Sequence, residues 1–267
     1  MGKDILETII ERKRLTLAAE EEAVPESFLE KELDNYAVGT RFHPFVSMKE
    51  SLGKSRFGII SEFKRRSPSK DWINREADAA VVTPAYEAAG ASALSILTDE
   101  PFFGGSMRDV IKARQRVNLP ILRKDFIVSS YQLLQAKLIG ADAVLLIAAC
   151  LTKEECKQLA KKAHELGLET LLEVHSEREL EYVGDCIDMV GVNNRNLGTF
   201  HTDVANSFRL ASLLPKDMLL VSESGISKAE TVKQLREAGF RGFLIGETFM
   251  KTSNPGEALK DFIRQLE

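Results

Sequence analysis

Short apolar runs recur along the chain about every 20 to 30 residues, and a stretch with helical spacing separates each run from the next. The runs are rich in branched side chains, and most are apolar at nearly every position instead of at alternate positions. Such runs are typical of parallel strands that are covered on both faces. Eight runs fit this description, at residues 57–62, 93–98, 120–124, 143–147, 169–173, 189–193, 218–223 and 242–246.

The segments between the runs have helical signals. Residues 152–166 carry apolar side chains three and four apart, have Glu154 and Glu155 in the first turn, and are followed by Gly167. Capping-box patterns at residues 176–179 and 227–230 indicate two further helix starts. Eight strand–helix repeats without a long loop favour a closed (β/α)8 barrel, the TIM barrel, over an open doubly wound sheet. The sequence also lacks the G-x-G-x-x-G turn of a dinucleotide-binding sheet.

The length agrees with one such barrel, which typically takes about 250 residues, since the chain has 267. We therefore predict a single domain over residues 1–267. Residues 1–45 precede the first strand and are predicted to form an N-terminal helical extension, because apolar residues stand at helical spacing among many charged ones. These apolar residues are Ile5, Leu6, Ile9, Ile10 and Leu17. The alternative for this segment is a solvated charged arm.

Composition excludes several classes of protein. A net charge of −4 and a pI near 5.8 argue against a nucleic-acid binder. No apolar run approaches the roughly 20 residues of a membrane helix, and no signal-peptide segment is visible, so we expect a cytoplasmic protein. Its three cysteines are then expected to be reduced. The four histidines show no paired spacing, so we expect no metal site.

Five polar residues stand at or just past the ends of separate apolar runs. In a closed parallel barrel these strand ends meet on one face, where the chemistry of this fold takes place. The spacing therefore predicts one active site built from Glu62, Lys124, Glu173, Asn193 and Glu223.

Small residues near the last two strands predict a phosphate site. Gly225 follows the seventh run and Gly246 ends the eighth. Glycines there allow backbone N–H groups to approach an anion, and the loops after strands seven and eight are a recurrent phosphate site in this fold. The alternative is that both glycines only permit tight turns.

The loop after the first run carries four cations within residues 62–70, which suits an anionic substrate. Lys64 is two residues past Glu62, on the same side of an extended strand, and is therefore predicted to point inward.

Several of these segments, taken together, closely resemble indole-3-glycerol phosphate synthases of tryptophan biosynthesis. The resemblance is carried in chain order by residues 62–70 (EFKRRSPSK), 97–106, 122–126 (LRKDF), 172–175 (LEVH), 191–197 (GVNNRNL) and 222–226 (SESGI). It extends over almost the whole chain and includes charged clusters that a generic barrel would lack.

The resemblance implies that the substrate is 1-(2-carboxyphenylamino)-1-deoxyribulose 5-phosphate, which is closed to indole-3-glycerol phosphate with loss of carbon dioxide and water, without a cofactor or metal. It implies that Lys124 is the general acid for ring closure and that Glu173 is the main carboxylate for dehydration, with Glu62 and Lys64 as a neighbouring pair. Other enzymes of tryptophan biosynthesis are candidate partners.

The resemblance also implies the substrate contacts. Asn193, Arg195, Glu223 and Ser224 would align the substrate, and Gly225, Gly246 and the N–H of Glu247 would hold its phosphate, with Lys64 as a further phosphate contact. Ser67, Pro68, Phe103, Phe126, Leu145 and Leu197 would complete the substrate pocket, although apolar residues near a barrel mouth are often only core.

Asp71 and Glu247 depart from the family pattern, which commonly has glycine at the first position and, in some relatives, a small hydroxyl residue at the second. Asp71 could stiffen the first loop, and Glu247 would have to contribute through its backbone. A different barrel enzyme, such as an isomerase or a Schiff-base aldolase, and a non-catalytic barrel stay open as alternatives.

Overall fold

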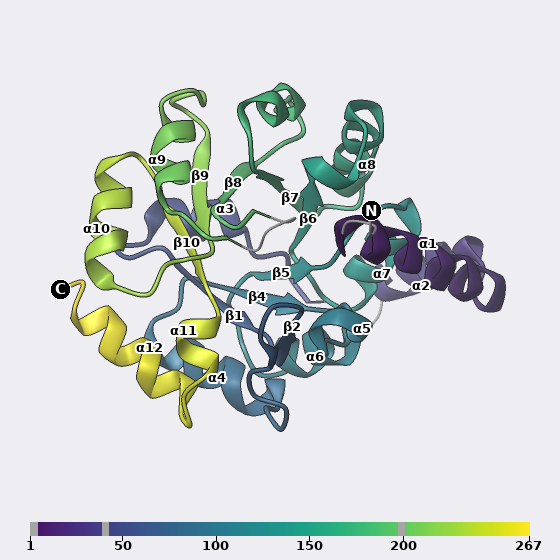
Figure 1. The fold of residues 1–267 in the computed structure, drawn as a ribbon. Coiled ribbons are helices and arrows are strands. Elements are labelled where there is room, and N and C mark those ends of the chain that lie inside the picture. The colour runs from purple at the N-terminus through teal and green to yellow at the C-terminus, as the bar shows by residue number, and fades with distance from the viewer. Residues whose placement is uncertain (1–4, 39–42, 197–200) are drawn as a thin grey trace.

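The protein is described by a computed structural model over residues 5–38, 43–196 and 201–267. Its centre is a closed barrel of eight parallel strands surrounded by helices (Figure 1), which confirms the predicted TIM barrel. Neighbouring strands pair in the order β1-β10-β9-β8-β7-β6-β5-β4. The barrel strands are β1 (Ile59–Phe63), β4 (Ala93–Leu97), β5 (Ile121–Lys124), β6 (Ala143–Ile147), β7 (Glu169–Val174), β8 (Met189–Asn193), β9 (Leu219–Glu223) and β10 (Gly242–Ile245).

Helices and one small hairpin complete the described elements. The hairpin joins β2 (Arg66–Ser67) to β3 (Asp71–Trp72). The α-helices are α1 (Ile5–Ala23), α2 (Glu26–Val38), α3 (Met48–Lys54), α4 (Ala79–Ala89), α5 (Glu100–Phe103), α6 (Met107–Arg114), α7 (Ser130–Leu138), α8 (Lys153–Glu165), α9 (Ala205–Ala211), α10 (Ala229–Glu237), α11 (Glu247–Met250) and α12 (Pro255–Arg264). Two short 3₁₀ helices are η1 (Ala148–Cys150) and η2 (Glu177–Tyr182).

The predicted helix over 152–166 is present as α8, and Thr152 caps it through a reciprocal bond with Glu155. The pattern at 176–179 opens a helix, but that helix is the 3₁₀ helix η2. The prediction of a capping box at 227–230 is wrong. The helix α10 begins at Ala229, one residue later than a cap at Ser227 would place it, and its N-cap, Lys228, makes no side-chain capping bond.

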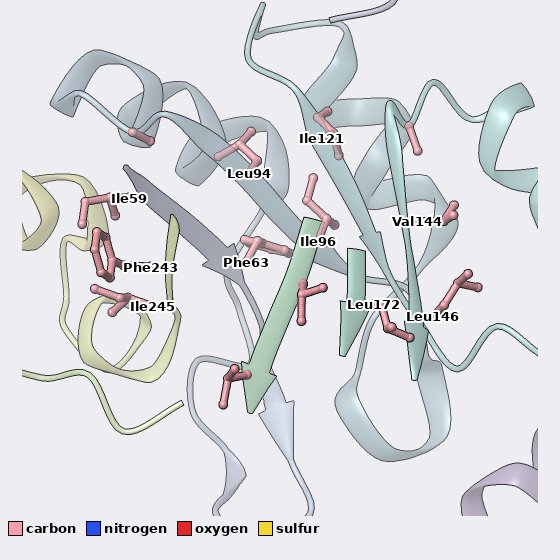
Figure 2. Packing of buried hydrophobic residues seen from close by; sticks show 14 of the residues in the cluster. Ile59, Phe63, Leu94, Ile96, Ile121, Val144, Leu146, Leu172, Phe243 and Ile245 are labelled. Carbon is pink, nitrogen blue, oxygen red and sulfur yellow. The ribbon is translucent and has the colours of Figure 1, made fainter. Parts of the chain in front are cut away.

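The barrel is packed on both faces of its sheet, which explains the continuous apolar runs. One set of side chains, including Ile60, Leu122 and Leu171, fills the interior. Met48 and Leu52 of α3 join this interior cluster, and the N–H of Met48 bonds Glu169 at the start of β7, so α3 closes the N-terminal end. The alternate set faces the helices, as Figure 2 shows for Ile59, Phe63, Leu94, Ile96, Ile121, Val144, Leu146, Leu172, Phe243 and Ile245.

The N-terminal extension lies against the barrel as two helices. Leu17 of α1 and Leu29 of α2 pack with Tyr131 and Leu134 of α7, and Figure 1 shows α1 and α2 side by side next to α7. Lys13 of α1 binds two carboxylates that follow barrel strands, Asp99 at 2.9 Å and Asp125 at 2.8 Å. The predicted amphipathic helix is therefore confirmed, and the alternative of a solvated arm is wrong for residues 5–38.

Candidate active site

The five polar residues at the strand ends line one cavity of about 320 Å³ at the C-terminal end of the barrel. Glu62, Lys124, Glu173, Asn193 and Glu223 come from β1, β5, β7, β8 and β9. A cavity of this size lies at the small end of the range for ligand pockets, roughly 300 to 1,000 Å³. The fold thus brings together groups that are as far as 161 residues apart in the sequence, from position 62 to position 223.

Lys124 stands between two carboxylates. Its Nζ is 3.0 Å from Oε2 of Glu173 and 3.5 Å from Oε2 of Glu223. Burial alone would lower the pKa of the Lys124 ammonium, but Glu173, Glu223 and Glu62 outweigh burial and raise that pKa above its ordinary value. The site therefore holds a charged ammonium that points at its centre.

The pKa values of the two carboxyl groups beside Lys124 are shifted in opposite directions. Burial favours the neutral form of Glu173, but Lys124, His175 and a hydrogen bond from Asn193 lower its pKa to about 2. Burial, Glu173 and Glu62 raise the pKa of Glu223 to about 8, against the effect of Lys124. The surroundings therefore favour the ionised form of Glu173 and the protonated form of Glu223. Environments that separate the pKa values of neighbouring groups are a mark of acid–base sites.

Two glycines leave the space that the carboxyl groups of Glu223 and Glu62 occupy. A Cβ atom on Gly191 would lie 2.1 Å from Oε1 of Glu223, and one on Gly246 would lie 2.2 Å from Oε1 of Glu62. Both distances are far below van der Waals contact, so no larger side chain fits without moving a carboxylate. The sequence position of Gly246 predicts a phosphate contact, and the structure gives this glycine a second role.

The cationic side chains of the loop after β1 have different partners. Lys64 points inward and pairs with Glu62, and both line the cavity. Arg65 instead makes two bonds to Asp109, at 2.6 and 2.8 Å. Arg66 binds Asp71 at 2.7 Å and lies over the ring of Trp72. Arg65, Arg66 and Lys70 do not line the cavity, so the expectation of a cationic rim is wrong for these three residues.

Asp71 has a backbone φ of +54°. This left-handed conformation favours glycine and costs other residues roughly 1 kcal/mol, least of all Asp and Asn. Asp71 also closes the hairpin by pairing with Arg66. The conformation gives a physical reason why a glycine would be common at this position and why aspartate is tolerated.

A hydrogen bond joins two loops at the cavity mouth. Nη1 of Arg195 donates to Oγ of Ser69 in the first loop at 3.0 Å, and the backbone N–H of Arg195 donates to Oδ1 of Asn193. Ser67 and Pro68 line the cavity beside this link. The loops after β1 and β8 are therefore tied together over the site.

An apolar wall lies beside the charged groups. Its predicted members Pro68, Phe103, Phe126 and Leu145 all line the cavity, and the rings of Phe103 and Phe126 are 6.0 Å apart. Leu197 lies outside the described residues. Further lining residues were not predicted from the sequence, and they include Ile5, Leu6 and Ile9 of α1, Leu97 of β4 and Ile147 of β6. The apolar start of α1 was the available signal for the first three.

The opposite side of the cavity is formed by the loops after β9 and β10. Ser224, Gly225, Gly246 and Glu247 line it as predicted residues, and Ser227, Thr248 and Lys251 line it without having been predicted. Ser224 and Gly225 have φ values of +66° and +77°. A serine held in this conformation is strained, and such strain concentrates at functional sites.

Within the described ranges, no group of three or more His, Cys, Asp or Glu side chains is placed to hold a metal ion. The helices in the same part of the chain include none that is both long and apolar enough to cross a membrane.

Comparison with protein families gives one match over nearly the whole chain. The model of the family described as indole-3-glycerol phosphate synthase matches residues 6–262. An indole-3-glycerol phosphate synthase from Bacteroides thetaiotaomicron is 58% identical over 265 residues, which cover 99% of this chain and 100% of the relative. The relative of the same description from Lachnoclostridium phytofermentans is 40% identical, over 94% of this chain and 95% of its own length.

Solved structures of lower identity share the fold. The 3-hexulose-6-phosphate synthase from Salmonella typhimurium superposes with a TM-score of 0.61 at 12% identity, over 79% of this chain and 100% of that chain. A tryptophan synthase α-subunit from Pyrococcus furiosus gives a TM-score of 0.58 at 18% identity, over 78% and 97% of the two chains.

Proposed function

The chain belongs to the indole-3-glycerol phosphate synthase family and has that activity, and we propose that Lys124 and Glu173 carry its two proton-transfer steps. Family membership removes the alternatives of an isomerase, an aldolase or a non-catalytic barrel. The observation that supports the assignment of residues is the pairing of Lys124 with both Glu173 and Glu223 inside the cavity.

Ring closure is the step for Lys124. The aromatic carbon that bears the carboxylate forms a bond to the ketone carbon of 1-(2-carboxyphenylamino)-1-deoxyribulose 5-phosphate, and the ketone oxygen takes a proton. A charged ammonium in a buried site both stabilises the negative charge growing on that oxygen and supplies the proton. The carboxylate then leaves as carbon dioxide and returns its electron pair to the ring.

Dehydration is the step for Glu173. A base removes a proton from the carbon beside the nitrogen, and the new hydroxyl leaves as water with a proton from an acid. Glu173 is ionised and adjacent to Lys124, so it fits the base. Glu62 and Lys64, which are paired in the same cavity, form the second acid–base pair.

The remaining residues hold the substrate. Glu223, whose surroundings favour its protonated form, donates to a substrate hydroxyl, and Asn193, Arg195, Ser67 and Ser224 align the chain of hydroxyls. The wall of Pro68, Phe103, Phe126 and Leu145 takes the aromatic ring, and Leu197 is assigned to the same wall. Lys64 pairs with the substrate carboxylate or phosphate. Gly225, Gly246 and the N–H of Glu247 hold the phosphate.

The assignment of Glu173 to dehydration can be tested in a single turnover. Excess protein is mixed with substrate, carbon dioxide release is followed with label in the carboxylate, and the indole product is followed by fluorescence. Carbon dioxide must leave before indole can form, because the ring carbon is not aromatic while it bears the carboxylate, so the order alone is not informative and the Glu173→Gln variant is the test. This variant should release carbon dioxide faster than it forms indole, and equal slowing of both products would contradict the assignment of Glu173 to dehydration.

The phosphate site predicts that inorganic phosphate competes with the substrate and stabilises the fold. A ligand at 100 times its Kd adds about 2.7 kcal/mol to the free energy of unfolding. Gly225→Ala should remove this stabilisation, because Gly225 has φ +77° and its new Cβ would lie 2.6 Å from Cγ2 of Thr202. Thermal unfolding with and without phosphate measures it.

Gly239→Ala is the matched control, because Gly239 also has a positive φ of +105° but its Cβ would meet nothing within 4 Å. This variant should lose backbone stability and keep the response to phosphate. Equal protection of the Gly225→Ala variant would place the phosphate elsewhere.

We also propose that residues 1–267 form one domain that works in the cytoplasm and associates with other enzymes of tryptophan biosynthesis. The cluster of Leu17, Leu29, Tyr131 and Leu134 between the extension and the barrel supports one domain. The free thiols of Cys150, Cys156 and Cys186 suit a reducing compartment.

A further inference from the structure

His175 lies behind Glu173, just past the end of β7. Its Nε2 is 3.4 Å from Oε1 of Glu173, and its Nδ1 is 3.6 Å from Oε2 of Glu179. The side chain is 14% exposed and is not among the residues that line the cavity. The imidazole is therefore held between two carboxylates at ion-pair distance, and Glu173 links it to the active site.

Local structure fixes both neighbours of this imidazole. Oε2 of Glu179 accepts the backbone N–H groups of His175 at 2.5 Å and Ser176 at 3.3 Å, which anchors it at the start of η2. Glu173 is 2% exposed, and its two carboxylate oxygens face different residues. Oε2 faces Lys124, and Oε1 faces His175. Glu173 thus has one potential cation on each side.

The charged and titratable groups around His175 favour its protonated form. Burial lowers its pKa, but Glu179, Glu173 and the more distant Glu223 on β9 outweigh burial and raise it. Cys150 of η1 is near enough for Glu173 and Glu179 to affect it electrostatically, and it stays a neutral thiol because burial raises its pKa. From α9, Asn206 contributes only a neutral contact to the carbonyl of His175.

The reaction changes the charge on one side of Glu173. When Lys124 gives its proton to the ketone oxygen it becomes a neutral amine, so Glu173 loses its nearest cation before dehydration begins. A buried carboxylate without a cation favours its protonated form, which cannot act as a base. Glu173 must nevertheless stay ionised until it accepts the proton of the dehydration step.

We propose that His175 is a positioning residue that serves as the second counter-ion of Glu173, keeping it ionised and oriented after Lys124 has given up its proton. Glu179 holds the imidazole in place for this purpose. The proposal rests on the role of Glu173 as the base in the proposed function and adds a residue that does not touch the substrate.

The pH dependence of kcat tests the proposal in the His175→Gln variant. Loss of a cation beside a carboxylate raises the pKa of that carboxylate, typically by about one to three units. The acidic limb of kcat, where Glu173 becomes protonated, should therefore move to higher pH by at least about one unit. A limb at the wild-type position would overturn the proposal.

Glu179→Gln is the matched control within the same network. Its glutamine oxygen can still accept a backbone N–H, and Glu173 alone keeps His175 protonated at the low pH of the limb. This variant should keep the wild-type limb. If both variants shifted the limb equally, the limb would respond to any change in this network instead of to the cation on His175, and the proposal would be wrong.

A measurement without turnover separates this inference from the role of Glu173. In protein labelled with ¹³C at the glutamate carboxyl, the Glu173 signal is assigned by its loss in Glu173→Gln and titrated with acid. It should titrate at higher pH in His175→Gln than in the wild type. An unshifted titration would reject the counter-ion role while leaving Glu173 as base, whereas full turnover by Glu173→Gln would reject the base role itself.

Discussion

Lys124→Met should lower kcat about 10²- to 10⁴-fold, the range usual for loss of a positioned general acid. The side chain it removes is the ammonium that lies between Glu173 and Glu223. In a single turnover this variant should slow carbon dioxide release and indole formation together, because both follow ring closure. Steady-state indole fluorescence gives kcat, and labelled substrate gives the two rates.

Glu173→Gln should lower kcat by a similar factor, but it should slow the release of carbon dioxide and the formation of indole to different extents. A glutamine cannot accept the proton of the dehydration step, so indole formation should slow more than carbon dioxide release.

Lys70→Met serves as the control for the loss of a lysine in Lys124→Met, because Lys70 is exposed in the first loop and should be replaced without effect. Wild-type turnover by folded Lys124→Met protein would refute the assignment.

The Lys124→Met protein should still fold. Removal of one partner of a buried ion pair can cost about 3 to 5 kcal/mol when the other charge is left uncompensated. Here burial and the neighbouring carboxylates already favour the protonated form of Glu223, and Glu173 keeps His175 beside it. Without Lys124 the pKa of Glu223 rises further above its unfolded value, so the loss of stability should be larger at pH 9 than at pH 6.

The sequence was sufficient for the barrel and for the polar residues at its strand ends. The apolar runs predicted strands covered on both faces, and a closed parallel barrel has only one C-terminal end at which their last residues can meet. Glu62, Lys124, Glu173, Asn193 and Glu223 line one cavity for this topological reason. None of these positions depends on the detailed packing of side chains.

Features set by side-chain packing across long sequence separations were not predicted. Lys13 meets Asp99 and Asp125 only because α1 crosses the barrel end, and this crossing also brings Ile9 to the cavity. Arg65 faces Asp109 instead of the substrate. No periodicity in the sequence encodes which of two neighbouring cations turns inward and which turns toward a helix.

The space that Gly191 and Gly246 leave for the carboxyl groups of Glu223 and Glu62 was also not predictable, because a glycine at or near a strand can equally mark a bulge or a bend. Gly191→Ala should lower kcat by about 100-fold, the cost of misplacing a reacting group by about 1 Å. The new methyl group would lie 2.1 Å from Oε1 of Glu223 and force that carboxyl out of position. Gly246→Ala should have a similar effect through Glu62, at 2.2 Å.

Two further variants separate this steric effect from a general effect of alanine. Gly184→Ala, whose Cβ would meet nothing within 4 Å, should keep wild-type kcat.

Glu223→Ala removes the carboxyl that the methyl group of the Gly191→Ala variant would strike. The double variant Gly191→Ala/Glu223→Ala should therefore have a kcat no lower than that of Glu223→Ala alone. Such non-additivity is expected when the effect of one substitution acts through the other residue. Independent losses that multiply in the double variant would show that Gly191 affects catalysis by a route that does not involve Glu223. Alanine is otherwise no worse than glycine inside a strand, so the variant isolates the space that Gly191 leaves for the carboxyl.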